Sequence, residues 1–321
     1  MKTKPAASGS PAVPEPRRPR AQRLIRPTLF GTMKYLGRPI DFRTPVGEPA
    51  LASHESVAWR VFKNPVTLFI GGISAVILEL AEPRVREGVW NHTSFRTDPV
   101  RRMRRTGLAA MITVYAARSV AEDVIGRVGR MHGRVEGVTE GGLAYRADDP
   151  ELLTWVQVTA SAQFLAAYHR FATPLSDAEQ DRFFEDASPS ARLYGATAAA
   201  SRHDAARIYE AMRPSLAPSA ILDEYFEIVS NAPAIPWPLK GLQAPAIRAA
   251  INIIPADIRA ALGLESQLTE EDTRRLKRAA GIANRIAIPL SPQVQACRRL
   301  GLPGDYLHRA TNRTAVGDAP A

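Results

Sequence analysis

One histidine in the sequence occupies a position where a metal ligand could stand. His132 lies in the segment GRVGRMHGRVEG at 126–137, among glycines and arginines. Ile125, Val128, His132 and Val135 follow one another at helical spacings of three or four, which puts the imidazole on a buried apolar stripe. A neutral imidazole in an apolar wall can ligate haem iron. It can equally be a core histidine that is hydrogen bonded to a carbonyl, and the spacing leaves both interpretations open.

The glycines around this histidine indicate that a bulky group approaches the same helix. Gly126, Gly129 and Gly133 lie on faces adjoining that of His132, and each costs about 1 kcal/mol relative to alanine inside a helix. A flat macrocycle or a tightly packed second helix would account for them. The sequence offers no His-x-x-x-His pair, no cysteine pair and no Glu-x-x-His motif, the patterns that other protein metal sites use. A metal held by His132 alone would therefore be a haem iron.

A cluster of arginines precedes this histidine in the segment DPVRRMRRTG at 98–107. Arg102, Arg105 and Thr106 lie within one turn of a predicted helix. Arginines that partly face a core need anions, which haem propionates or an oxygen-derived ligand would supply. The alternative is an exposed basic face with surface ion pairs, and we prefer that alternative for Arg101 and Arg104.

Helix-start signals recur along the chain and predict the elements that carry these residues. Asp-Pro pairs begin at Asp98 and Asp149, and capping-box spacing occurs at Ser119 and Ser176. Apolar residues recur every three or four positions between these signals. The predicted helices span about 65–95, 99–117, 119–137, 149–172, 176–187, 202–213, 219–231, 244–253, 255–262 and 269–287.

These patterns predict an all-α protein with a single large multi-helix domain at 28–307. The first 27 residues form a basic tail with seven lysines and arginines against one acid, Glu15. This tail and the C-terminal residues 308–321 lack apolar periodicity, so we expect both to be disordered. Since the formal charge of the whole chain is +10, the body carries only +4. That excludes a basic face for a specific nucleic-acid partner.

The sequence predicts neither a membrane-spanning helix nor a disulfide within the chain. The uncharged run at 64–78 is shorter than the roughly 20 residues that a span needs. It is expected to form a buried helix, with a peripheral membrane contact as the alternative. Cys297 is the single cysteine, so no disulfide can form within the chain, and we expect a cytoplasmic location.

Several segments in order resemble one known family. LELAEPRVREGVWNHTSFRTDPVRRMRRTG, VGRMHGRVEG, YRADDPELLTWVQVTA and AYHRFATPLSDAEQDRFFED are similar to the catalytic domain of the MpaB-type oxygenases and rubber oxygenases. The resemblance runs from about residue 55 to 255. It implies an all-helical fold around a haem b pocket, with O2 used to cleave carbon–carbon double bonds in isoprenoid chains.

The resemblance also implies roles for individual residues. His132 would be the axial iron ligand, and Arg102, Arg105 and Thr106 would lie on the distal side of the haem. Arg105 stands where the rubber oxygenases have a lysine, which keeps the charge but changes the hydrogen-bond geometry. A glutamate would act as the base, for which we choose Glu82 over Glu79 and Glu87.

The chain departs from the family pattern at one further position. Gln157 replaces a histidine that many similar domains have, so any role of that histidine in proton transfer or ligation lapses. His92 and His169 remain candidates for contact with substrate or haem, or for structural roles.

The function expected from the sequence is that of a haem-dependent oxygenase, a dioxygenase acting with O2 on an apolar, isoprenoid-like substrate. A non-catalytic protein of the same fold that binds haem or an apolar small molecule is the alternative. A third possibility, binding of nucleic acid or anionic membranes, would depend on the basic tail.

Overall fold

Helices dominate the structure, as the sequence predicts. The computed structural model describes residues 33–309 with the exception of 236 and 238. The helices of the first half are α1 (Val57–Val61), α2 (Pro65–Ala81), α3 (Pro83–Asn91), α4 (Pro99–Tyr115), α5 (Arg118–His132) and α6 (Pro150–Phe171). Those of the second half are α7 (Asp177–Tyr194), α8 (Arg202–Met212), η2 (Arg213–Ser215), α9 (Ala220–Asn231), η3 (Leu239–Leu242), α10 (Gln243–Asn252), α11 (Ala256–Ala261), α12 (Glu270–Arg285) and α13 (Pro292–Arg299). Two short hairpins, β1 (Lys34–Tyr35) with β2 (Arg38–Pro39) and β3 (Glu136–Val138) with β4 (Ala144–Arg146), are antiparallel.

The predicted tails fall almost entirely beyond the part of the chain that the structure describes. Residues 1–27 lie outside it, as do 310–321. His308 belongs to the folded body, because it is buried and its Nδ1 lies 2.9 Å from the carbonyl oxygen of Asn284.

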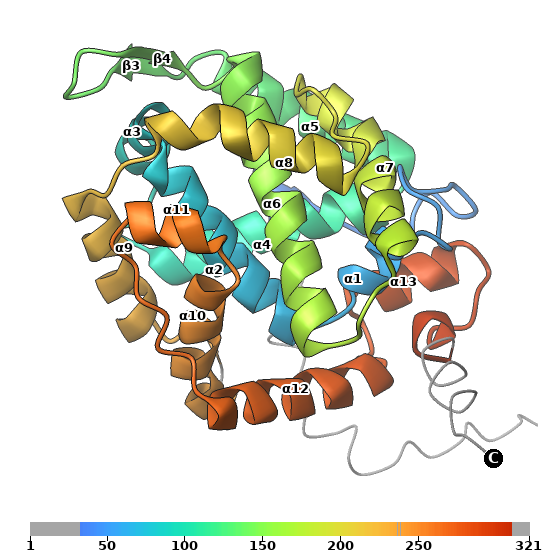
Figure 1. The fold of residues 1–321 in the computed structure, drawn as a ribbon. Coiled ribbons are helices and arrows are strands. Elements are labelled where there is room, and N and C mark those ends of the chain that lie inside the picture. Colours follow the sequence, from blue (N-terminus) through green and yellow to red (C-terminus); the bar gives the residue numbers. More distant parts are fainter. Residues whose placement is uncertain (1–32, 236, 238, 310–321) are drawn as a thin grey trace, which may run out of the picture.

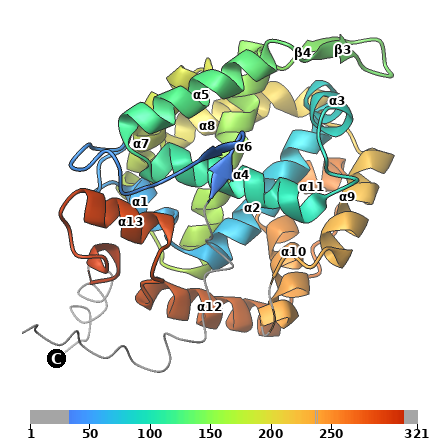
Figure 2. The same ribbon diagram turned by 180° about the vertical axis from the view of Figure 1, so that it is seen from behind.

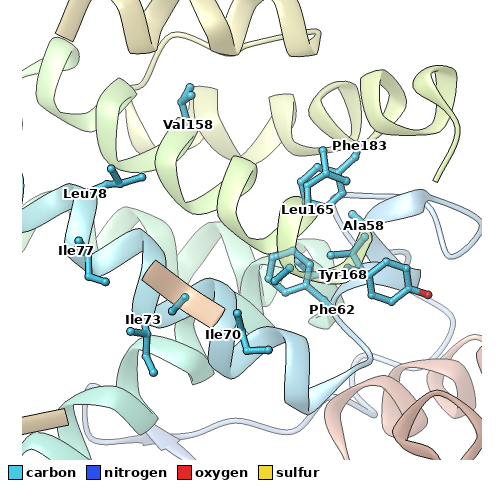
Figure 3. Packing of buried hydrophobic residues seen from close by; sticks show 14 of the residues in the cluster. Ala58, Phe62, Ile70, Ile73, Ile77, Leu78, Val158, Leu165, Tyr168 and Phe183 are labelled. Carbon is cyan, nitrogen blue, oxygen red and sulfur yellow. The ribbon is translucent and has the colours of Figure 1, made fainter. Parts of the chain in front are cut away.

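Two long helices, α2 and α6, form the centre of the molecule, and the other helices surround them (Figure 1). Gly71 allows the close contact between them, since a Cβ atom there would lie 2.8 Å from the Cα atom of Phe164. Trp155 Nε1 on α6 also donates to the carbonyl oxygen of Leu78 on α2, at 3.2 Å. Buried side chains from α1, α2, α6 and α7 fill the adjoining space, including Ile70, Leu165 and Phe183 (Figure 3).

The segment predicted as one helix at 65–95 is two helices with a sharp bend. Asn64 caps α2, its Oδ1 accepting from the backbone N–H groups of Val66 and Thr67. Pro83 ends α2, because a proline disfavours helical backbone in the residue before it. Glu82 therefore has extended backbone and becomes the N-cap of α3.

Helices α4 and α5 lie on the same face of the molecule as the β1–β2 hairpin (Figure 2). Asp98 caps α4 by accepting from the N–H of Arg101 at 3.1 Å, as its Asp-Pro pair predicts. The capping box predicted at Ser119 is wrong. Helix α5 begins at Arg118, while the Ser119 N–H and hydroxyl donate to the Glu48 carboxylate at 2.6 and 2.9 Å.

Helix α5 ends at His132 rather than at 137, because a hairpin comes directly after it. Gly137 on β3 lies over the ring of Tyr145 on β4, where a Cβ atom would come within 2.6 Å of the Tyr145 hydroxyl. The β3–β4 hairpin extends from the body of the molecule beside α3 (Figure 1). His132 thus occupies the junction between a helix and a hairpin.

Across the described residues, no single helix has the length and apolar composition to cross a membrane. Helices α2 and α3 pass that test only as a pair, and the angle between them is 111°.

Candidate active site

His132 is the last residue of α5 and is half-buried. Its imidazole has no hydrogen-bond partner among the described residues. Burial lowers the pKa of His132 below its ordinary value. The carboxylate of Asp148 opposes this shift, and the positive charge of Arg102 adds to it. The ring is therefore neutral at neutral pH, which is the form that can ligate a metal.

The glycines of α5 are not explained by a second helix. Beside Gly129, no described atom lies within 4 Å of an added Cβ atom, and Gly126 meets only the guanidinium of Arg130 at 3.6 Å. Gly133 meets the Asp148 carboxylate at 3.5 Å. Of the two explanations that the sequence left open, the tightly packed helix is therefore wrong for these described residues.

Arg102 reaches toward this histidine from the second turn of α4. Its Nη1 donates to Thr106 one turn later, and its guanidinium carbon lies 5.5 Å from the centre of the Phe95 ring. Its Nε is buried without a partner among the described residues. A buried donor of this kind costs roughly 1–3 kcal/mol unless a ligand or water satisfies it. Arg105 is exposed.

Glu79 joins the same group from α2. Burial raises the pKa of its carboxyl group to about 7, and the nearby charge of Arg102 partly opposes the shift. The side chain is half-buried, and its carboxylate makes no hydrogen bond or ion pair with any described residue.

The other two glutamates considered in the sequence have structural partners. Glu82, the preferred choice, is fully buried. Its Oε2 accepts from the N–H of Val85 at 2.8 Å and its Oε1 from Arg84 Nε at 2.8 Å. Glu87 accepts from Asn91 Nδ2 at 2.7 Å. Both oxygens of Glu82 are thus occupied, and Glu79 is the glutamate that faces Arg102.

Two tyrosines near this group, Tyr35 and Tyr225, and a third that neighbours Tyr35 were missed in the sequence. Burial raises the pKa of Tyr35 on β1, while the charges of Arg105 and Arg102 partly lower it. Tyr194, at the end of α7, has its hydroxyl 3.4 Å from the Thr113 hydroxyl. Tyr225 on α9 is close enough to Glu79 for the glutamate charge to raise its pKa. The sequence pattern around each tyrosine predicts only that it is a buried residue of its own element. Their positions relative to the candidate site depend on the fold.

The remaining candidate residues have local contacts. His169 Nδ1 accepts from the backbone N–H of Leu175 at 3.0 Å, which is a structural role. His92 Nε2 lies 3.4 Å from the Tyr145 hydroxyl. Gln157 Nε2 lies 3.5 Å from the Ser161 hydroxyl, one turn along α6.

Two cavities lie near these elements, and neither is lined by His132, Arg102 or Glu79. The smaller has a volume of about 270 Å³ and lies between the β1–β2 hairpin and α5, with Tyr35, Ile40 and Val124 in its wall. The larger, of about 390 Å³, lies among α6, α7, α8 and α11. Like the smaller cavity, it contains none of the predicted site residues.

Among the residues that the structure describes, no three His, Cys, Asp or Glu side chains gather closely enough to share a metal ion. Of the residues considered for the site, His132, Arg102 and Glu79, from three different helices, have polar side-chain atoms without a partner among the described residues. A protein-family model described as the catalytic domain of the ER-bound oxygenase mpaB/B' and rubber oxygenase matches residues 59–285. That match spans well over half of the chain and contains all three of these side chains.

The chain belongs to the MpaB/rubber-oxygenase family. Its membership assigns it to the oxygenases, and hence to the oxidoreductases that act on a substrate with O2. No curated protein and no solved structure matched the chain. The family match also ends before α13 and begins inside α1, so the structure supplies the account of both flanks.

Proposed function

We propose that this MpaB/rubber-oxygenase family member is a haem b-dependent oxygenase with His132 as the axial iron ligand. One observation carries the proposal: α2, α4 and α5 each bring a polar side chain without a full set of partners to one region. These are Glu79, Arg102 and His132, and the charge of Arg102 acts on both of the others. An iron ligand, a partner for an anion and a base are the three groups that such an enzyme needs.

The residues present fit a haem. His132 offers an unpartnered neutral imidazole at the end of α5. The orphaned Nε of Arg102 is a donor suited to a propionate carboxylate, because charge-assisted hydrogen bonds to carboxylates are strong. No other described group satisfies it.

An apolar stripe leads along α2 to the glutamate. Leu68, Gly72 and Val76 follow one another at helical spacing, are half-buried, and precede Glu79 on the same face. Such a wall suits an apolar substrate, and an isoprenoid chain is one whose length could follow the stripe.

Haem, when bound, would supply the activation of O2. The protein's own residues would do the rest. The carboxylate of Glu79 would accept a proton from a substrate carbon next to a double bond, so that the C–H bond breaks and an O–H bond forms on Glu79. The guanidinium of Arg102 would hold an anionic group, and the apolar stripe would exclude water from the reacting atoms.

The test combines binding with turnover. We would load the purified chain with haem b and measure O2 consumption with the isoprenoid squalene, using wild type, Glu79→Gln and Glu151→Gln. Glu151 is an exposed glutamate that pairs with Arg84. We expect wild type and Glu151→Gln to consume O2, and Glu79→Gln to keep its haem but lose at least about tenfold in rate.

Two results would count against the proposal. If wild type takes up no haem, the cofactor assignment is wrong. If it binds haem tightly but consumes no O2 with any isoprenoid, the chain is a haem-binding protein without turnover.

A further inference from the structure

Tyr225 lies in the middle of α9 with its ring almost fully buried, at 1% exposure. The ring packs edge-on against Phe95, with 5.5 Å between ring centres, and against Phe226 at 6.0 Å. Phe95 in turn contacts the guanidinium of Arg102, at 5.5 Å. Phe95 therefore links the Tyr225 ring to Arg102, at the edge of the candidate site.

The hydroxyl of Tyr225 has no hydrogen-bond partner among the described residues. The hydroxyl of a buried tyrosine ring usually has a hydrogen-bond partner, and the Tyr225 hydroxyl is not among the polar atoms sealed from solvent, which leaves room for a water molecule. Glu79 is an acceptor that lacks a donor, since its carboxylate accepts no hydrogen bond from any described side chain. Helices α2 and α9, which carry the two groups, pack directly against each other.

We propose that Tyr225 is a positioning residue that donates a hydrogen bond to the Glu79 carboxylate through one water molecule. A role of this pair in catalysis rests on the proposed function, in which Glu79 is the base. The pair itself can be tested without haem. During the reaction Tyr225 keeps its proton, while Glu79 gains the one that leaves the substrate carbon.

The electrostatics are consistent with this role. Burial and the negative charge of Glu79 both raise the pKa of Tyr225, so the phenol stays protonated and can only donate. A donor that contacts the carboxylate stabilises its charged form and lowers its pKa. From α4, Arg102 is the described charged group that acts on Glu79 in the same direction. From α3, Arg86 instead donates to the carbonyl oxygens of Leu80 and Ala217.

The experiment compares Tyr225→Phe with wild type in the haem-free full-length chain. Phenylalanine keeps the ring that packs on Phe95, so a purely structural role would leave the titration of Glu79 unchanged. The measurement is the pH titration of the glutamate side-chain carbons by ¹³C NMR, with Glu79→Gln used to assign the Glu79 signal. We expect Tyr225→Phe to raise the titration midpoint by about 0.5–1 pH unit.

Tyr209→Phe is the matched control. Tyr209 is another buried tyrosine, and its hydroxyl accepts from Gln163 Nε2 at 3.0 Å in the wall of the 390 Å³ cavity. Its substitution should leave the Glu79 midpoint in place. An unchanged midpoint in Tyr225→Phe, or equal shifts in both variants, overturns the proposal.

A second measurement needs no substitution at Tyr225, and so remains valid if Tyr225→Phe fails to fold. In wild type labelled at tyrosine Cζ, the Tyr225 signal should shift with the same midpoint as Glu79, and this inflection should vanish in Glu79→Gln. A Tyr225 signal that stays flat across the Glu79 titration contradicts the pair. Since no haem is present, neither result depends on whether the cofactor assignment holds.

Discussion

Two glutamates three residues apart, Glu79 and Glu82, have opposite surroundings in this protein. Glu79 is on the last turn of α2, where a half-buried carboxyl group faces Arg102 without a partner among the described residues. Glu82 lies just beyond the end of that helix, where it caps α3 and pairs with Arg84. The bend at Pro83 separates them, so Glu82 has structural partners and Glu79 has none among the described residues.

The raised pKa of Glu79 makes a prediction about stability. The folded state holds this proton up to a pH of about 7, whereas the unfolded chain releases it near its ordinary value of 4.5. Wild type therefore loses stability as the pH rises from 4.5 to about 7. Because Gln cannot ionise, Glu79→Gln should gain about 2 kcal/mol over wild type between pH 5 and pH 8. Urea unfolding at the two pH values measures this gain, and a constant difference would contradict it.

Glu82→Gln should behave differently. It removes the charge that Arg84 Nε contacts at 2.8 Å and weakens the cap on the N–H of Val85. Breaking a buried pair and a helix cap together costs about 2–4 kcal/mol. We expect this loss in urea unfolding at pH 7.5, with haem uptake unchanged. A stable Glu82→Gln that fails to turn over substrate would instead make Glu82 the base.

At the residue scale, the sequence could predict which side chains matter when the signal is local. Arg102 and Thr106 are one helical turn apart, and the structure joins them by a hydrogen bond. The choice among the glutamates was not local. It depended on the bend at Pro83 and on the partner of each carboxylate, which only the fold determines.

Among the elements, the packing of α2 against α6 fixes the position of α2, which carries Glu79. Gly71 and Gly72 are neighbours, but only Gly71 faces the backbone of α6, where an added Cβ atom would lie 2.8 Å from Phe164 Cα. At Gly72 the nearest atom, Phe164 Cε1, is 3.8 Å away. The two glycines thus provide a matched pair of positions.

Alanine should have opposite effects at these positions. Gly71→Ala forces the helices apart and should cost about 2 kcal/mol, even after the gain in helix propensity. Gly72→Ala has room for its methyl group and should gain about 0.5–1 kcal/mol. Thermal unfolding of the two variants measures these changes in stability. Equal changes at both glycines would show that α2 and α6 do not pack as described.

Helix starts were the elements best predicted from the sequence. Asp98, Asp149 and Ser176 each cap the helix expected of them. Helix ends were less accurate, because they depend on the next segment of the chain. A hairpin shortens α5 to His132, whereas α7 continues to Tyr194. Helices α1 and α13 and both hairpins were missed, since segments this short carry little periodic signal.

On the scale of the whole molecule, segments outside the family match complete the fold. Arg299 on α13 is buried and donates to the carbonyl oxygens of Phe42, Glu48 and Tyr115, each at 2.8 Å. The Glu48 carboxylate in turn binds Ser119 at the start of α5. This chain of contacts connects the C-terminal helix to the helix that ends at His132.

Removing that connection should destabilise the molecule. Arg299→Leu leaves three buried carbonyl groups unpaired and should cost about 3 kcal/mol or more in the free energy of unfolding. Arg298→Leu is the control, because Arg298 is exposed on the same helix. If the two variants unfold alike, α13 does not stabilise the fold in the way that we describe.

The most direct test of His132 as the iron ligand is the visible absorption spectrum of the chain after titration with haem b. We would compare wild type with His132→Ala, and use His203→Ala, which replaces an exposed histidine on α8, as the control. We expect a Soret band that saturates at one haem per chain in wild type and His203→Ala. In His132→Ala this band should be lost or shifted, and added imidazole should restore it. A His132→Ala protein that binds haem with the wild-type spectrum and affinity would contradict the central claim.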